Sequence, residues 1–143
     1  MPRKPTIKSL TNKADRLTSY FVRQLYADEH GVVSCCTCGL RKHWREVDCG
    51  HYKSRRHKST RWALTNLGPQ CKGCNAFGKV KLSSTPGEPA YFRKWLVKTW
   101  GEDEVEKIEQ LATETWKPTI GELETLTGEL KKALKQKGFD LPK

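Results

Sequence analysis

The sequence lacks any long hydrophobic run. No stretch of 18 apolar residues occurs among its 143 residues, and a membrane-spanning helix needs about 20. The first residues, Met1 to Pro5, also lack the apolar segment of a secretory signal peptide. Hydrophobic residues make up only 36% of the chain, which limits the core that a domain of this length can bury. We therefore expect a cytoplasmic protein, with no membrane partner, whose modest core is reinforced by a bound metal.

Cysteines are few but clustered. Four of the six form two C-x-x-C pairs, Cys35 with Cys38 and Cys71 with Cys74. In the cytoplasm such thiols are metal ligands or free thiols rather than disulfides. Two pairs at this spacing are typical of a structural zinc ion (Zn²⁺) held by four thiolates, which we predict here. Cys36 is an alternative to Cys35, although its spacing to Cys38 is short, and Cys49 is expected to be a small buried residue.

Acidic residues are scarce in the middle of the chain. Residues 31–100 contain fourteen Lys and Arg against three Asp and Glu, whereas residues 101–143 contain seven against ten. The net charge of +11 is therefore concentrated on the segment that holds the cysteine pairs. This distribution is typical of a surface that binds a polyanion such as DNA. A basic surface that only confers solubility is the alternative.

The order of predicted elements favours an α+β fold. A flexible basic arm over residues 1–9 precedes a helix in which apolar residues recur every three or four positions from Leu10. Two short strands are predicted over 44–52 and 60–67, joined by a basic loop, and a helix over 70–80 carries the second cysteine pair. Zinc would clamp this strand–strand–helix (ββα-metal) core, which we place within residues 10–81.

The C-terminal region is predicted to be helical. After a linker over residues 82–88, Pro89 suits a first helical position and Gly101 a helix end. A capping box of Thr119 and Glu122 begins the last helix of the region 89–143. That helix carries a leucine stripe, which indicates ordinary packing or, as a less favoured reading, the seam of a homodimer: Leu123, Leu126, Leu130 and Leu134.

Several residues between the cysteine pairs, and one directly after the second pair, have the chemistry of phosphodiester hydrolysis. His51, at the end of the first strand, suits a general base because histidine titrates near neutral pH. Asn75 offers an oxygen to a hard cation such as Mg²⁺ or Mn²⁺. Asn66 suits a side-chain bond to the backbone that fixes the hairpin. The basic residues expected to hold the DNA backbone are Lys53, Arg55, Arg56, His57, Lys58 and Arg61.

At these residues the chain resembles the HNH (His-Asn-His/Asn) endonuclease superfamily, and more closely the phage NinG/Rap recombination nucleases. The resemblance covers about residues 10–112 and includes C-x-x-C-G, Asp-Cys-Gly-His-Tyr and Pro-Gln-Cys-x-x-Cys-Asn. It implies a phage or prophage enzyme that cuts branched DNA, such as Holliday junctions and D-loops. It also implies one divalent cation, with His51 as the general base and Asn75 as a metal ligand.

One position departs from the pattern of that superfamily. Many HNH nucleases have an acidic metal ligand directly before the histidine, where this chain has Gly50. Asp48 is the nearest acid, and we predict it as a catalytic residue that, with Asn75, ligates the divalent cation. Alternation along a strand points it away from His51 unless Gly50 forms a bulge. His57 is a substitute ligand. Two other functions stay open: a general HNH nuclease acting on ordinary duplex, and a zinc module that only binds nucleic acid.

Overall fold

The structure, a computed structural model, describes residues 2–77 and 88–143. These residues form two compact units. The helical unit comprises Met1–Phe21 and Lys117–Lys143, and the cysteine unit comprises Val22–Trp116. The boundaries expected from the sequence divide the chain differently, because they separate residues 89–116 from the segment with the cysteine pairs. No helix in the described part of the chain is long and apolar enough to cross a membrane.

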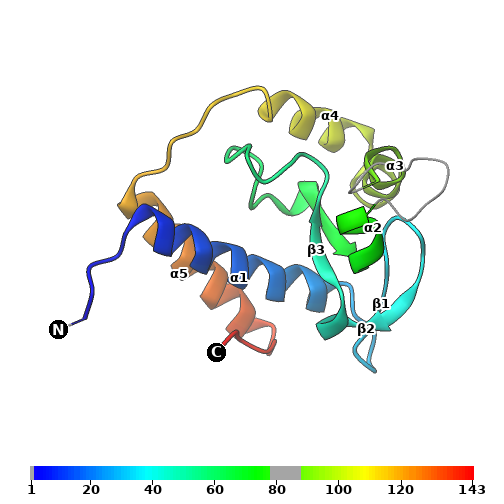
Figure 1. Cartoon of the computed structure of the whole chain (residues 1–143), viewed down its shortest axis with the longest axis horizontal. Coiled ribbons are helices and arrows are strands. Elements are labelled where there is room, and N and C mark those ends of the chain that lie inside the picture. Colours follow the sequence, from blue (N-terminus) through cyan, green and yellow to red (C-terminus); the bar gives the residue numbers. More distant parts are fainter. Residues whose placement is uncertain (1, 78–87) are drawn as a thin grey trace. The chain divides into compact units, whose positions relative to one another are not determined.

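The helical unit pairs α5 (Ile120–Gln136) with the part of α1 (Ile7–Leu25) that ends at Phe21 (Figure 1). Reciprocal bonds between Thr6 and Ser9 begin α1, so the helix starts inside the stretch predicted to be a flexible arm. The predicted capping box of Thr119 and Glu122 begins α5. Its leucine stripe is largely covered, since Leu123 and Leu134 are fully buried. A homodimer through this stripe stays a prediction.

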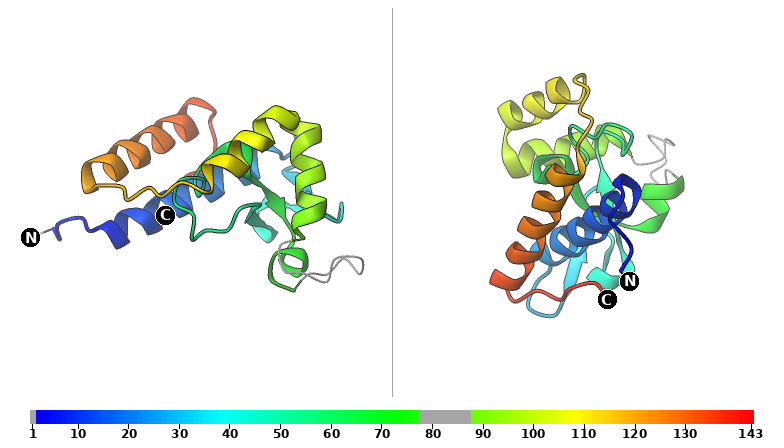
Figure 2. Two further views of the ribbon diagram at one scale, coloured as in Figure 1. Left: turned by 90° about the horizontal axis from the view of Figure 1, so that it is seen from above. Right: turned by 90° about the vertical axis from the view of Figure 1, so that its left-hand side faces the viewer.

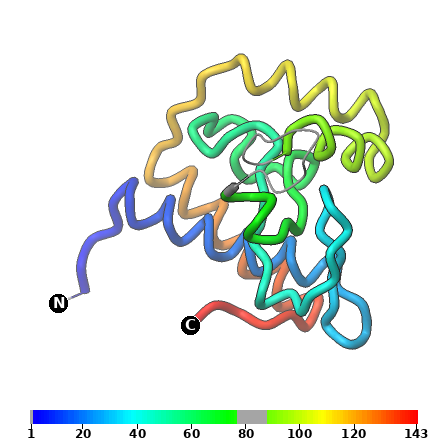
Figure 3. The backbone as a smooth tube through the Cα atoms, turned by 45° about the vertical axis from the view of Figure 1, so that its right-hand side comes forward, coloured from blue at the N-terminus to red at the C-terminus, as the bar shows by residue number. Residues whose placement is uncertain are grey.

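The cysteine unit contains two short antiparallel hairpins (Figure 1). In the first, β1 (Val32–Ser34) pairs with β2 (Arg41–His43), and a 3₁₀ turn (Trp44–Glu46) follows. In the second, β3 (Asp48–His51) pairs with β4 (Leu67–Gln70) in regular register, with Gly50 opposite Gly68. The β3–β4 loop, residues 52–66, leaves the second hairpin and returns to it (Figure 3) and ends in a 3₁₀ turn (Leu64–Asn66). The short helix α2 (Lys72–Phe77) follows β4.

Both predicted strands of this hairpin need correction. The first is shorter than 44–52, because Trp44–Glu46 forms a 3₁₀ turn. The second lies at Leu67–Gln70 instead of 60–67, so Gly68 and Pro69 lie within the strand. Proline is tolerated there because a two-stranded sheet has an open edge that needs no N–H donor. Pro69 does take part in hydrogen bonding through its carbonyl oxygen, which accepts a bond of 2.8 Å from the N–H of Cys36.

Two further helices of the cysteine unit pack against the second hairpin. They are α3 (Pro89–Trp100) and α4 (Glu102–Leu111), and the chain changes direction between them at Gly101 (Figure 2). Phe92, Leu96 and Val105 form a buried cluster with Cys36. The predicted helix start at Pro89 and end at Gly101 are confirmed. The predicted linker lies outside the described residues except for Glu88, as do the last predicted residues of the helix that carries the second cysteine pair.

Candidate functional site

Four cysteine sulfurs meet where the first hairpin approaches the start of α2. Cys35 and Cys38 lie in the turn between β1 and β2, while Cys71 and Cys74 lie at the start of α2. The four Sγ atoms all lie within 4.8 Å of one another, and those of Cys38 and Cys71 are 3.7 Å apart. A tetrahedral zinc with Zn–S bonds of about 2.3 Å separates its sulfurs by about 3.8 Å. The predicted four cysteines therefore come together in an arrangement that fits one zinc ion.

Hydrogen-bond donors already point at these sulfurs. The N–H of Cys71 donates to Cys35 Sγ at 3.3 Å, and the N–H of Cys74 donates to Cys71 Sγ at 3.5 Å. Burial raises the pKa of the Cys35 thiol, but hydrogen bonds from Thr37 Oγ1 and the Cys71 N–H outweigh burial and lower that pKa to about 6. Burial raises the pKa of Cys74, so a bound cation must displace its proton. Such outer bonds orient metal ligands.

The two remaining cysteines lie outside this cluster. Cys36 is buried beside Phe92 and Leu96, and burial raises the pKa of its thiol. It therefore does not replace Cys35 as a ligand. Cys49, expected to be buried, is only partly covered on β3. Neither cysteine forms a disulfide.

The Asn66 side chain links two parts of the β3–β4 loop by hydrogen bonds. Its side chain is fully buried and accepts a bond of 2.7 Å from the N–H of Lys53. Its Nδ2 donates to the carbonyls of Lys53 at 3.0 Å and Thr60 at 3.1 Å. These are side-chain-to-backbone bonds of the kind expected for Asn66. They fix both ends of the basic stretch that follows His51.

His51 is oriented by the same loop. Its Nε2 lies 3.0 Å from the carbonyl oxygen of Arg61. A carbonyl can only accept, so this contact requires Nε2 to carry the proton in the neutral ring, which makes Nδ1 the basic nitrogen. The imidazole, which is partly exposed, is thus held in a tautomer that presents a proton acceptor. That is the protonation state a general base requires.

Asp48 and Asn75 lie side by side between β3 and α2. The Nδ2 of Asn75 donates to Asp48 Oδ2 at 3.0 Å, and the Nζ of Lys72 donates to Asp48 Oδ1 at 2.7 Å. The Asp48 side chain is 30% exposed to solvent. A carboxylate and an amide in contact and open to solvent offer the oxygen chemistry that Mg²⁺ or Mn²⁺ prefers. Of the residues predicted to bind a catalytic cation, these two are brought together.

His51 and Asp48 point to opposite faces of β3. The pairing runs without interruption from Asp48 to His51, so Gly50 forms no bulge and side chains three residues apart alternate in direction. An acid at Gly50 has no room. A Cβ there would collide with Gln70 Oε1 and would lie 2.9 Å from the Phe92 ring. The glycine that replaces the usual acid is therefore required by the packing of α3 on the hairpin.

The basic side chains of the β3–β4 loop differ in how firmly they are held. Arg55 and Arg56 are exposed, whereas the other predicted contacts are partly covered. Lys53 Nζ lies 4.9 Å from the ring centre of Tyr52. Arg61 lies over Trp62 and donates to the carbonyl of Arg55 at 2.9 Å. His57 and Lys58, the last of the predicted set, are among the partly covered side chains. The basic side chains of the loop thus lie within residues 53–61.

One network near His51 was missed from the sequence. Tyr52 donates to Glu109 on α4 at 2.6 Å, and Arg93 on α3 bonds both oxygens of Glu109. The Arg93 guanidinium lowers the pKa of Glu109 to about 2, with a further contribution from Tyr52. Burial and the contact with Glu109 raise the pKa of Tyr52 to about 12. Tyr52 belongs to the Asp-Cys-Gly-His-Tyr motif, but no periodicity or motif pairs it with Glu109, which is 57 positions away.

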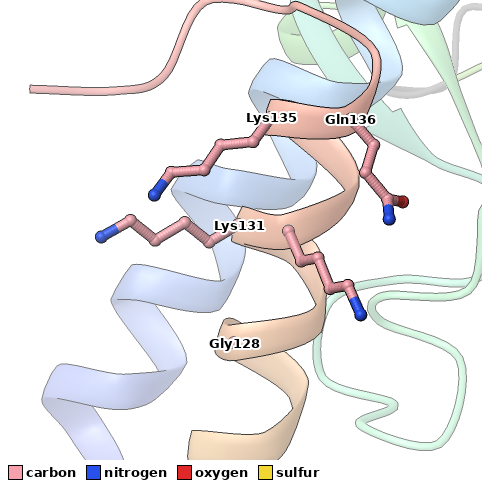
Figure 4. A pocket seen from close by; sticks show the side chains of 5 residues that line it. Gly128, Lys131, Lys135 and Gln136 are labelled. Atoms are coloured by element: carbon pink, nitrogen blue, oxygen red, sulfur yellow. The ribbon is translucent and has the colours of Figure 1, made fainter.

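A second set of lysines lies on α5 in the helical unit. A hollow there contains none of the predicted site residues and is lined by Gly128, Lys131, Lys132, Lys135 and Gln136 (Figure 4). The lysines occupy the later part of the helix, where positive charge interacts favourably with the helix dipole. Helix stabilisation explains their position without a ligand.

Comparison with known proteins gives one match. Residues 2–138 match the model of a protein family described as "NinG: Bacteriophage Lambda NinG protein". No curated protein and no solved structure matches the chain. The matched stretch includes every residue of the four-sulfur cluster and of the β3–β4 loop.

Proposed function

Because this chain belongs to the family of the bacteriophage lambda NinG protein, we propose that it is a phage recombination endonuclease. It would hydrolyse phosphodiester bonds in branched DNA, such as Holliday junctions and D-loops, in the bacterial cytoplasm. The strand–loop–strand–helix order of β3, β4 and α2 beside a four-cysteine cluster supports an HNH-type core. The observation that carries the proposal is the contact of His51 Nε2 with the Arg61 carbonyl at 3.0 Å.

That contact supports His51 as the general base. With the proton on Nε2, Nδ1 accepts a proton from the attacking water. The carbonyl also stabilises the imidazolium that forms, since the N–H it already binds becomes more acidic as the ring gains charge. Asn66 acts as a positioning residue here, because it holds the loop that supplies this carbonyl.

Asp48 and Asn75 are the proposed ligands of a catalytic divalent cation. Such a cation supplies charge neutralisation at the phosphate and the leaving 3′ oxygen. Phosphoryl displacement runs in line, with the attacking and leaving oxygens on opposite sides of the phosphorus. The base is thus needed on the side of the attacking oxygen and the cation on the side of the leaving oxygen, and the opposite faces of β3 keep the two groups apart. His51 and Asp48 are three positions apart on an extended strand, so about 10 Å separates their Cα atoms.

The β3–β4 loop supplies the proposed contacts with the DNA backbone. Its cations lie between the proposed base and Asn66 in the sequence. Contacts of this kind bind phosphates without reading sequence. They suit a nuclease that selects DNA by its branched structure. The four-thiolate zinc would hold the first hairpin to α2 and so fix Asn75 against β3.

Cleavage of a four-way junction and of a matched linear duplex, each with Mg²⁺ or Mn²⁺, tests this function. We expect cation-dependent cutting that favours the junction. His51→Ala should lower the rate by about 10²- to 10⁴-fold, the usual contribution of a general base. His30→Ala is the matched control, since His30 lies on an exposed turn. Equal cutting of both substrates would support a general duplex nuclease, and DNA binding without cutting would reduce the protein to a binding module.

A further inference from the structure

Both oxygens of the Asp48 carboxylate are occupied by nitrogen donors. Lys72 Nζ contacts Oδ1 at 2.7 Å, and Asn75 Nδ2 contacts Oδ2 at 3.0 Å. The donors come from successive turns of α2, so the carboxylate is bound to the helix at two points. Each oxygen keeps a second lone pair, but a divalent cation bound there would lie close to the Lys72 ammonium. The two positive charges therefore compete for the carboxylate.

We propose that Lys72 is a built-in competitor for the divalent cation, so that its ammonium and the cation occupy the Asp48 carboxylate alternately. This inference rests on Asp48 being a cation ligand, as in the proposed function. The ammonium carries only donors and therefore binds the carboxylate as a point charge, in the way a metal ion does. The two cations repel each other at this distance, so binding one releases the other.

The surroundings allow this exchange. The Lys72 side chain is 68% exposed, so it can move into solvent without disturbing the core. Its backbone cannot move as easily, because the neighbouring Cys71 belongs to the four-sulfur cluster. Asn75 must also turn its amide by half a rotation, so that Oδ1 in place of Nδ2 faces the cation. In the absence of a divalent cation, Lys72 and Asn75 thus each hold one oxygen of the Asp48 carboxylate.

The alternative is an ordinary surface ion pair with no link to cation binding. Lys107 and Glu104 form such a pair on α4 at 3.0 Å, with side-chain exposures of 73% and 44%. It lies in the same unit and carries the same charges, so Lys107→Met is a matched control for the loss of one positive charge. If Lys72 competes with the divalent cation, removing Lys72 changes Mn²⁺ binding, whereas removing Lys107 does not.

The experiment measures Mn²⁺ binding to the zinc-loaded full-length protein by calorimetry. Lys72→Met should tighten Mn²⁺ binding by about two- to fivefold, which corresponds to the strength of an exposed ion pair. Lys72→Arg retains a cation and should bind Mn²⁺ as the wild type does, and so should Lys107→Met. Asp48→Asn in the Lys72→Met background should abolish the tightened binding. Zinc content and circular dichroism confirm that each variant is folded.

Several results would overturn the inference. These are equal or weaker Mn²⁺ binding by Lys72→Met, the same gain from Lys107→Met, a gain that survives Asp48→Asn, or no Mn²⁺ binding by either protein. DNA cleavage is measured separately, which keeps the two proposals apart. A tighter site in a protein that never cuts DNA would leave the exchange intact and refute the nuclease. If the protein cuts DNA but Lys72→Met binds Mn²⁺ as the wild type does, the nuclease is supported and the exchange at Asp48 is refuted.

Discussion

Replacing Asn66 tests how the β3–β4 loop is held. In Asn66→Ala the loop loses three hydrogen bonds, two to Lys53 and one to Thr60. The bond to Thr60 is buried and the two to Lys53 are partly exposed. A buried group left without its partner costs about 1–3 kcal/mol, and a partly exposed bond contributes about 0.5–1 kcal/mol. We therefore expect the free energy of unfolding to fall by about 3 kcal/mol.

Tryptophan fluorescence in a denaturant titration isolates this effect. All five tryptophans lie within residues 22–116, so the signal reports on the cysteine unit alone. Asn75→Ala is the matched control, because it removes one partly exposed bond, the one to Asp48 at 3.0 Å. It should cost only about 0.5 kcal/mol.

An isosteric variant separates hydrogen bonding from packing. Asn66→Asp keeps the acceptor for the Lys53 N–H but loses both donors and places a charge against two carbonyl oxygens. It should therefore destabilise the unit at least as much as Asn66→Ala. The reasoning would be refuted if Asn66→Ala, at unchanged zinc content, unfolded within about 0.5 kcal/mol of Asn75→Ala.

Three further predictions concern the rest of the cysteine unit. Cys74→Ser should lose the predicted zinc and unfold at lower denaturant, whereas Cys49→Ser should retain the zinc content of the wild type by atomic absorption. In thermal melts, Gly50→Ala should cost about 1–3 kcal/mol, because its methyl group meets Gln70 and Phe92. Gly128→Ala, in open space on α5, should slightly stabilise the protein in the same measurement. The lowered pKa of Glu109, about 2, stabilises the fold above pH ~4.5, and this stability is lost as the pH falls through about 2. Between pH ~4.5 and about 2, the loss of unfolding free energy in Glu109→Gln should be smaller than in the wild type by about 1 kcal/mol, after allowance for solvent screening. The same loss in both proteins would contradict the lowered pKa of Glu109.

The parts of this structure that local spacing determines were predictable. Two C-x-x-C pairs specify four thiolates, and the sulfurs meet as expected because each pair spans a single turn. Thr119 with Glu122 and Pro89 with Gly101 mark helix ends through backbone hydrogen bonding alone. These signals involve residues within a few positions of one another, so the rest of the fold hardly affects them.

The parts that depend on distant contacts were not predictable. The second strand was predicted to end at residue 67, but β4 includes Pro69, because its edge position and a bond to Cys36 accommodate the proline. Gly50 could not be identified as a packing requirement without Phe92, which lies 42 positions later and touches it only through the arrangement of α3. Glu109 likewise reaches Tyr52 only because α4 packs beside the β3–β4 loop.

In the proposed mechanism His51, held by the Arg61 carbonyl, activates water for cleavage of branched DNA. This role is tested by the single-turnover rate of junction cleavage by zinc-loaded wild type and His51→Ala, each with saturating Mg²⁺. We predict junction-selective cutting by the wild type and a loss of about 10²- to 10⁴-fold in the variant. Cutting by His51→Ala at the wild-type rate, with junction binding unchanged, would contradict it.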